Sequence, residues 1–194
     1  MGQTTTSTQV WTPDSTDLGH PDVYLATMSA SIENGIGARL TKQELLQGLF
    51  ANIPSGTSVP ITGGTETVLA MTVNAGVGFN QGMTLAGGTV TITQAGLYSI
   101  SAGVTTAQST GYLDTKIYQN AGIVGRALTP ATTVGGGFAF GNTSVSVTCA
   151  VGDTLNVRIT AFTRTTPGGA DTATTLLTGA STYNTLSVTL LKAM

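Results

Sequence analysis

The stretch FNQGMTLAGGTVTITQAGLYSISAGV, residues 79–104, decides the fold of this chain. Val90 and Ile92 alternate with three threonines, which are Thr89, Thr91 and Thr93. This two-residue period is typical of a strand with one buried face. A Gln-Ala-Gly corner follows at 94–96, and residues 97–104 predict a second strand. The stretch therefore predicts a hairpin from a β-sandwich.

Segments of the same kind lie on both sides of this hairpin, separated by Gly-rich turns. Together they predict eight short strands at residues 68–73, 89–93, 97–104, 113–119, 123–128, 144–149, 154–162 and 186–191. Eight strands are the number expected for a jelly roll of two sheets. The predicted fold class is all-β, a two-sheet antiparallel jelly-roll sandwich.

Several landmarks resemble the globular heads of the first complement component and of tumour necrosis factor. Those heads carry a Phe and then a Gly-x-Tyr-x-Phe corner, matched here by Phe79, Gly96 and Tyr98, with Ile100 where the family prefers Phe. The segment LDTKIYQN at 113–120 is similar to a family strand that ends in Asn-Gly, with Ala121 inserted before the glycine.

Two later landmarks arrive in the family's order. SVSVTCAVGDTLNVRI at 144–159 is similar to its strand, Gly-Asp turn and strand. LSVTLL at 186–191 stands where the family ends on Phe-Ser-Gly-Phe-Leu-Leu, with Leu186 and Val188 replacing the Phe and the Gly. The resemblance covers roughly two-thirds of the chain. It implies a TNF-like jelly roll and a homotrimer of heads around a threefold axis.

The composition favours a protein that works in an assembly. Only 8% of the 194 residues are charged, although 40% are hydrophobic, and Thr is the commonest residue. Typical proteins have about 25% charged residues. Because charge keeps proteins apart, a surface of Thr, Ser and Gly favours association.

Composition also argues against several classes of partner. The net charge is −2 without a Lys/Arg block, so we expect no nucleic-acid partner. No apolar run has membrane-spanning length, and MGQTTTSTQVWT lacks the pattern of a signal peptide. We therefore expect no membrane partner. An extracellular-type head without an export signal suggests a virion protein that is made in the host cytoplasm.

The sequence before the strands predicts a separate docking region. Residues 1–56 are expected to form a mostly extended arm, residues 57–65 a linker and residues 66–194 the trimerising head. Within the arm, Thr41 and Glu44 form a capping box, and the apolar residues that follow predict a short amphipathic helix at about 41–50. A second short helix, capped by Asp22, is a weaker expectation.

Catalytic and metal-binding patterns are sparse. His20 is the sole histidine and lies far in sequence from Cys149, the sole cysteine. The acidic residues Asp14, Asp17 and Asp22 lack the spacing of a calcium loop. Asp153 is expected to cap its turn, and Asp114 to form an ion pair with Lys116. We expect no enzyme activity, no cofactor and no metal site.

These observations predict a virion structural protein, a homotrimeric capsid decoration or head-fibre protein of a bacteriophage that stabilises the capsid surface. Its partner would be the major capsid protein or another virion protein, bound by Trp11, Tyr24, Leu45, Leu46, Leu49 and Phe50. Candidates for the trimer interface are Tyr112, Tyr118, Phe162 and Tyr183. The alternative is a tail-fibre or spike head that binds a host surface receptor through loops 133–141 and 163–179.

Overall fold

The computed structural model describes residues 3–4, 11–12, 48–73, 83–133, 136–164, 169–179 and 183–194. The chain divides into two compact units, residues 1–45 and residues 46–194. In the first unit, β1 (Gln3–Thr4) pairs antiparallel with β2 (Trp11–Thr12). We call the second unit the head. Among the described residues, no helix is long and apolar enough to cross a membrane.

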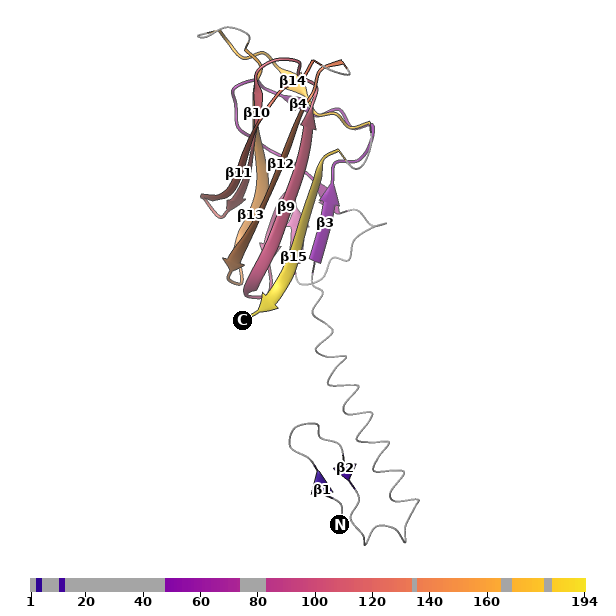
Figure 1. The fold of residues 1–194 in the computed structure, drawn as a ribbon, viewed down its shortest axis with the longest axis vertical. Helices are drawn as coiled ribbons and strands as arrows, with labels where there is room; N and C mark the ends of the chain where they lie inside the picture. Colours follow the sequence, from indigo (N-terminus) through magenta and orange to yellow (C-terminus); the bar gives the residue numbers. More distant parts are fainter. Residues whose placement is uncertain are drawn as a thin grey trace. The chain divides into compact units, whose positions relative to one another are not determined.

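Two antiparallel sheets form the head (Figure 1). The β10 sheet has the order β11-β10-β13-β8-β7, with β5 also paired to β13. Its strands are β11 (Gly122–Pro130), β10 (Tyr112–Gln119), β13 (Thr154–Phe162), β8 (Thr89–Ile92), β7 (Met83–Ala86) and β5 (Thr67–Val68).

The β9 sheet has the order β12-β9-β15-β3-β6. Its strands are β12 (Ala139–Cys149), β9 (Gly96–Thr106), β15 (Thr185–Ala193), β3 (Gly48–Asn52) and β6 (Thr72–Val73). A small sheet of β4 (Pro60–Ile61) and β14 (Thr174–Thr175) lies at the loop end of the head, opposite the C-terminus (Figure 1).

The core fills the space between the two sheets. Val90 and Ile92 are buried on β8 while Thr89 and Thr91 are only half-buried, as the alternation predicts. Tyr98 on β9 is fully buried, and its hydroxyl donates a 2.7 Å hydrogen bond to the backbone oxygen of Gln94. The two-sheet antiparallel jelly roll that the sequence predicts is confirmed.

The segment from residue 48 to 73 differs from the prediction. Gly48, Leu49 and Phe50 were expected to end a helix, but they form strand β3, which pairs with β15. The helical prediction is therefore wrong for these three residues, because pairing with a distant strand outweighs their local pattern. The rest of that helix, residues 41–47, lies outside the described residues, as do the second helix and most of the arm.

The head also begins earlier than predicted. Residues 57–65 were expected to be a linker, yet Ile61 is fully buried and β4 pairs with β14. The predicted strand at 68–73 is two strands, because the chain crosses from β5 in one sheet to β6 in the other, burying Leu69 and Met71 on the way.

Candidate functional surfaces

The residues predicted to bind a partner fall into three groups. Tyr24, Leu45 and Leu46 lie outside the described residues, and Trp11 is described only as part of strand β2. Leu49 is 2% exposed and belongs to the core of the head. Phe50 follows it on β3 and is half-buried.

Three of the four aromatic residues predicted for the trimer interface lie on one face. Tyr112, Tyr118 and Phe162 occupy the outward face of the β10 sheet, since their neighbours Leu113, Ile117 and Ala161 point into the core. The fourth, Tyr183, is 42% exposed and precedes β15 in the other sheet.

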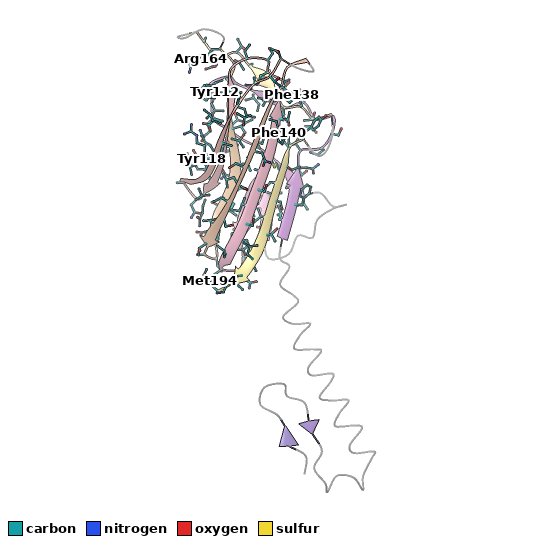
Figure 2. All side chains as sticks on the ribbon, in the orientation of Figure 1. Tyr112, Tyr118, Phe138, Phe140, Arg164 and Met194 are labelled. Carbon is teal, nitrogen blue, oxygen red and sulfur yellow. The ribbon has the colours of Figure 1, made fainter. Side chains whose placement is uncertain are left out.

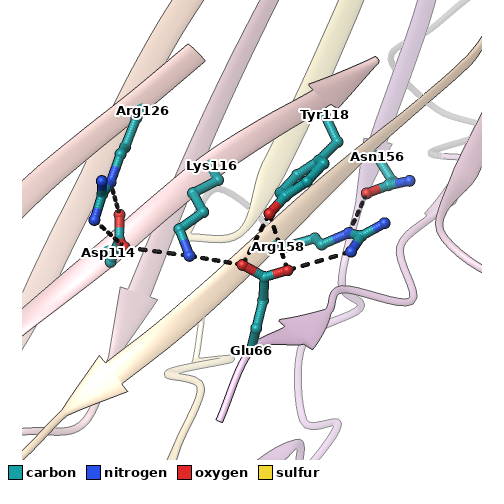
Figure 3. A network of polar contacts seen from close by, with 7 residues as sticks. All are labelled: Glu66, Asp114, Lys116, Tyr118, Arg126, Asn156 and Arg158. Carbon is teal, nitrogen blue, oxygen red and sulfur yellow. Dashed lines mark hydrogen bonds and ion pairs between the residues drawn. The ribbon is translucent and has the colours of Figure 1, made fainter. Parts of the chain in front are cut away.

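An ion network occupies the middle of this outward face (Figure 3). Asp114 is 1% exposed and accepts two hydrogen bonds of 2.8 Å from Nε and Nη2 of Arg126 on the neighbouring strand β11. Lys116 Nζ lies 3.3 Å from Asp114 Oδ2 and donates a 2.6 Å hydrogen bond to Glu66 Oε2. The predicted Asp114–Lys116 ion pair is confirmed, and it forms part of a larger network.

Glu66 joins the segment before β5 to strands β10 and β13. Its carboxylate accepts hydrogen bonds from the Tyr118 hydroxyl at 3.1 Å and from Arg158 Nη1 at 3.2 Å. The Arg158 guanidinium lies 4.0 Å from the centroid of the Tyr118 ring, and its Nε donates to Asn156 Oδ1 at 2.9 Å. The network therefore fixes three strands and a loop against one another (Figure 3).

The network shifts the pKa values of Glu66, Lys116 and Arg126 toward the charged forms. Burial raises the pKa of Glu66, but hydrogen bonds from Lys116, Arg158 and Tyr118 outweigh burial and leave that pKa below its ordinary value. Burial lowers the pKa of Lys116, but Glu66 and Asp114 more than compensate, so it lies above its ordinary value. Hydrogen bonds to Asp114 raise the pKa of Arg126. These carboxylates serve as ion-pair partners, an arrangement unsuited to general acid–base work.

The outward face of the β9 sheet has the opposite character. The outward side chains of the edge strand β12 and of its neighbours β9 and β15 alternate with residues that face the core. On β12, β9 and β15 they are Phe140, Asn142, Ser144, Ser146, Thr148, Leu97, Ser99, Ser101, Gly103, Thr105, Thr185, Ser187 and Thr189. None of these residues is charged, and the one charged residue on the three strands, Lys192, pairs with Leu97 at the end of the face nearest the C-terminus. Phe140 stands out because it is 45% exposed, near the loop end of the head (Figure 2). We call this surface the uncharged face.

A polar corner closes the turn between β12 and β13. The Asp153 carboxylate accepts hydrogen bonds from Ala150 N, Gln119 Nε2 and Asn120 Nδ2 at 2.8–2.9 Å, and its pKa is lowered, chiefly by Asn120 and then by Ala150. Gly152 has φ +89°, a conformation that favours glycine. The prediction that Asp153 caps its turn is confirmed.

Metal and thiol chemistry find little support in the described ranges. In them, no three His, Cys, Asp or Glu side chains come together as a metal site would require. Cys149 is buried, and burial raises its thiol pKa to about 11. Because the thiolate is the reactive form, this cysteine behaves as a small apolar side chain.

Asn184 was missed by the sequence analysis. It is fully buried; its Oδ1 accepts a 3.0 Å hydrogen bond from Thr105 N, and its Nδ2 donates to the backbone oxygen of Leu177 at 2.7 Å. Its own backbone oxygen accepts a hydrogen bond from Ile53 N. One side chain thus ties β9 and the loop after β14 to the start of β15, a role that no local sequence pattern signals.

Comparisons with known proteins bear on the fold. No family model matches the chain, and no curated protein matches its sequence. Solved structures do match. PRD1 vertex protein P5 is 15% identical with a TM-score of 0.51, and the match covers 75% of this chain and 97% of that one. Eiger TNF from S. frugiperda is 13% identical with a TM-score of 0.52, covering 77% and 95% of the two chains.

Murine APRIL, solved at pH 8.0, is 12% identical with a TM-score of 0.50, covering 75% of this chain and all of that chain. At such low identities these likenesses show the fold alone. None of these three proteins is described as an enzyme. The order of strands in the two sheets, the buried Tyr98 corner and these neighbours agree: the chain has the TNF-like jelly-roll fold.

Proposed function

We propose that this chain is a virion structural protein of a bacteriophage, a homotrimeric decoration or head-fibre protein that binds and stabilises the outer surface of the capsid. One of the similar structures is described as a vertex protein, which supports a virion role. The observation that carries the proposal is the contrast between the two outward faces of the head.

The uncharged face fits association with other copies of the chain. Burying a charged side chain is costly unless it is paired, whereas Ser, Thr and Gly cost little and allow backbones to approach closely. The β12 residues Ser144 and Ser146 are exposed, and their β9 partners are Ser101 and Ser99. Phe140 supplies an exposed aromatic anchor of the kind common at interfaces.

This assignment moves the proposed trimer interface away from the aromatic residues named above. Tyr118 already contacts Arg158 and Glu66 within the ion network, and Tyr112 stacks on Phe162 in the same subunit. The contacts of these three aromatic side chains lie within one head. Their placement therefore gives no support for a threefold axis at the outward face of the β10 sheet. We infer that the oligomer is a trimer from the resemblance to TNF-type heads.

The test of association is the oligomeric state. The full chain should behave as a trimer in light scattering, and Ser101→Arg or Ser144→Arg should shift it to monomer, because each places an unpaired charge within the contact. Thr84→Arg is the matched control, since Thr84 is exposed on β7 in the other sheet and its substitution should leave the trimer intact. A monomeric full chain, or a trimer that survives both uncharged-face variants, would contradict the proposal.

The capsid-docking role belongs to residues 1–45, with Trp11, Tyr24 and Leu45 as the proposed anchors together with the adjacent Leu46. Leu49 is no longer proposed as a capsid-binding residue because it belongs to the core of the head. Phe50 is excluded as well because it lies in strand β3. A contact made only with the assembled shell stabilises that shell by linkage.

Removal of residues 1–45 tests the docking role. The truncation must end before β3, since deletion through Phe50 would also remove part of a sheet. The truncated protein should remain a trimer and lose binding to purified shells in a co-sedimentation assay. Trp11→Ala in the full chain should weaken the same binding. If the truncated heads still decorate shells, residues 1–45 are not the docking segment.

A further inference from the structure

The loop end of the head carries a small aromatic platform of two stacked rings, with a cation over one of them. Tyr112 on β10 and Phe162 on β13 are directly opposite each other in the β10 sheet, and their rings stack with centroids 4.5 Å apart. Arg164 follows β13, and its guanidinium carbon lies 5.7 Å from the centroid of the Phe162 ring. Figure 2 shows Tyr112 and Arg164 at the end of the head opposite Met194.

Among the residues that the structure describes, Arg164 is the arginine of the head whose side chain has no acidic partner. Arg126 and Arg158 are both bound by carboxylates of the ion network. Arg164 is exposed, and in the ranges that the structure describes no carboxylate forms an ion pair with its side chain. The acid nearest in the loop stem, Asp171, binds the backbone and not the guanidinium: its Oδ1 accepts hydrogen bonds from the backbone N–H groups of Thr163 and Arg164, at 2.8 and 3.1 Å.

The platform is held rigidly although it borders a loop. The Asp171 carboxylate fixes both sides of the loop stem, and the Thr163 hydroxyl donates to the backbone oxygen of Thr172 at 2.9 Å. On the other side, Thr110 Oγ1 donates to the backbone oxygen of Thr163 at 2.7 Å. Arg164 therefore projects from a fixed stem beside the half-buried rings. A preorganised site of this kind loses little entropy on binding.

We infer that Tyr112, Phe162 and Arg164 form a shallow binding site for an acidic glycan, one whose sugar units carry a carboxylate. A pyranose ring presents a face of C–H groups that can lie on an aromatic ring, and its carboxylate can accept hydrogen bonds from a guanidinium. A single acidic sugar unit combines both groups at short range. An Asp or Glu side chain supplies the carboxylate without the C–H face, so a glycan fits this pairing better than an acidic peptide.

This inference goes beyond the proposed virion role and is independent of it. The platform lies on the outward face of the β10 sheet, so it would stay accessible if the uncharged face is buried between copies. The alternative function that the sequence predicts is receptor binding through loops 133–141 and 163–179. The present inference limits that binding role to three side chains, which lie where the second loop begins.

The experiment measures binding of the full chain to a trisaccharide of galacturonic acid by calorimetry, with galactotriose as the neutral probe of the same ring type. We expect the acidic probe to bind about tenfold more tightly, because it alone can use the guanidinium. Arg164→Gln should remove that preference. Lys192→Gln is the matched control, since Lys192 is a second cation without a described ion pair, and its loss should change nothing.

Tyr112→Leu tests the platform itself and should weaken binding of both trisaccharides, since it removes ring stacking and leaves the charge. Circular dichroism of each variant shows whether the sandwich remains folded. The inference is overturned if neither the galacturonate nor a sialylated trisaccharide binds with a Kd of about 1 mM or lower. It is also overturned if Arg164→Gln keeps the acidic preference, or if triglutamate binds as tightly as the galacturonate.

Discussion

Gly141 and Thr115 offer a sharp test of how the two sheets pack. Gly141 lies on β12 and Thr115 on β10, and both are buried where these strands face each other across the core. A Cβ atom added at Gly141 would lie 2.0 Å from Thr115 Oγ1 and 3.0 Å from Thr115 Cβ. Neither strand can simply move, because β12 is paired with β9, and β10 is paired on both sides.

We expect Gly141→Ala to destabilise the head by about 1–2 kcal/mol. Overpacking of a core costs about 1–3 kcal/mol, and the reduced freedom of the unfolded chain returns about 0.4–1 kcal/mol where the backbone suits alanine. Gly141 does have such a backbone, since its φ is not positive. Thr115 Oγ1 is fully buried without a hydrogen-bond partner in the described part of the chain, so no bond is lost when it is displaced.

The measurement is a double-mutant cycle with Thr115→Ala, followed by urea denaturation at one fixed protein concentration because association would make the midpoint depend on concentration. Removing the Thr115 hydroxyl and methyl groups clears the 2.0 Å clash but leaves the Cβ atom of residue 115 at 3.0 Å, so Gly141→Ala should cost clearly less in that background without becoming neutral. The coupling free energy should be about 1 kcal/mol. Gly122→Ala is the control, since its Cβ would have only one neighbour within 4 Å, at 3.7 Å. Equal costs of Gly141→Ala in both backgrounds would refute the packing argument.

Three further outcomes are expected. Asn184→Ala should lower the free energy of unfolding by about 2–4 kcal/mol in urea denaturation, because it leaves buried backbone groups without partners; a loss under 0.5 kcal/mol would contradict this role. The folded-state pKa of Glu66 is lowered, so its contribution to stability is present above its ordinary pKa near 4.5 and is lost as the pH falls through the folded value; Glu66→Gln should flatten the decline of the urea midpoint below pH 4.5, and an unchanged acid limb would count against it. Cys149 should react with a thiol reagent at pH 8 only at the rate of unfolding, since burial raises its pKa to about 11, and rapid labelling of the native protein would disprove that.

The strands that the sequence predicts well are those with a strong local period and a clear turn. β13 matches its predicted range of 154–162, and β8 and β10 differ from theirs by one residue. In each, apolar and polar residues alternate, and Gly or Asn marks a neighbouring turn, so the local pattern and the final sheet agree.

β3 shows where local pattern fails. The spacing of Leu45, Leu46, Leu49 and Phe50 matches the period of a helix, and Thr41 with Glu44 provides a capping box. The last two of these apolar residues nevertheless pair with Ser187 and Val188 of β15. A short stretch of sequence carries no signal from a partner strand that is so distant along the chain. The pairing with β15 therefore decided the secondary structure of these residues.

The surfaces were harder to predict than the strands, because they depend on register. Asp114 and Lys116 were recognised as a pair since they lie two residues apart on one strand. Glu66, Arg126 and Arg158 join them only through the alignment of three different segments. The uncharged face has the same origin, because it emerges when β12, β9 and β15 align their small side chains.

The position of β15 has a consequence for how this protein is made. The last strand of the chain lies between β9 and β3, so the interior of the β9 sheet stays open until residues 185–193 are available. Pairings between such distant segments slow folding, and a nascent head would expose its core edges until residues 185–193 have left the ribosome. Emergence of β15 from the ribosome would then set the moment at which the head can complete its fold. Even a short C-terminal truncation should yield an aggregation-prone product in place of a smaller soluble head.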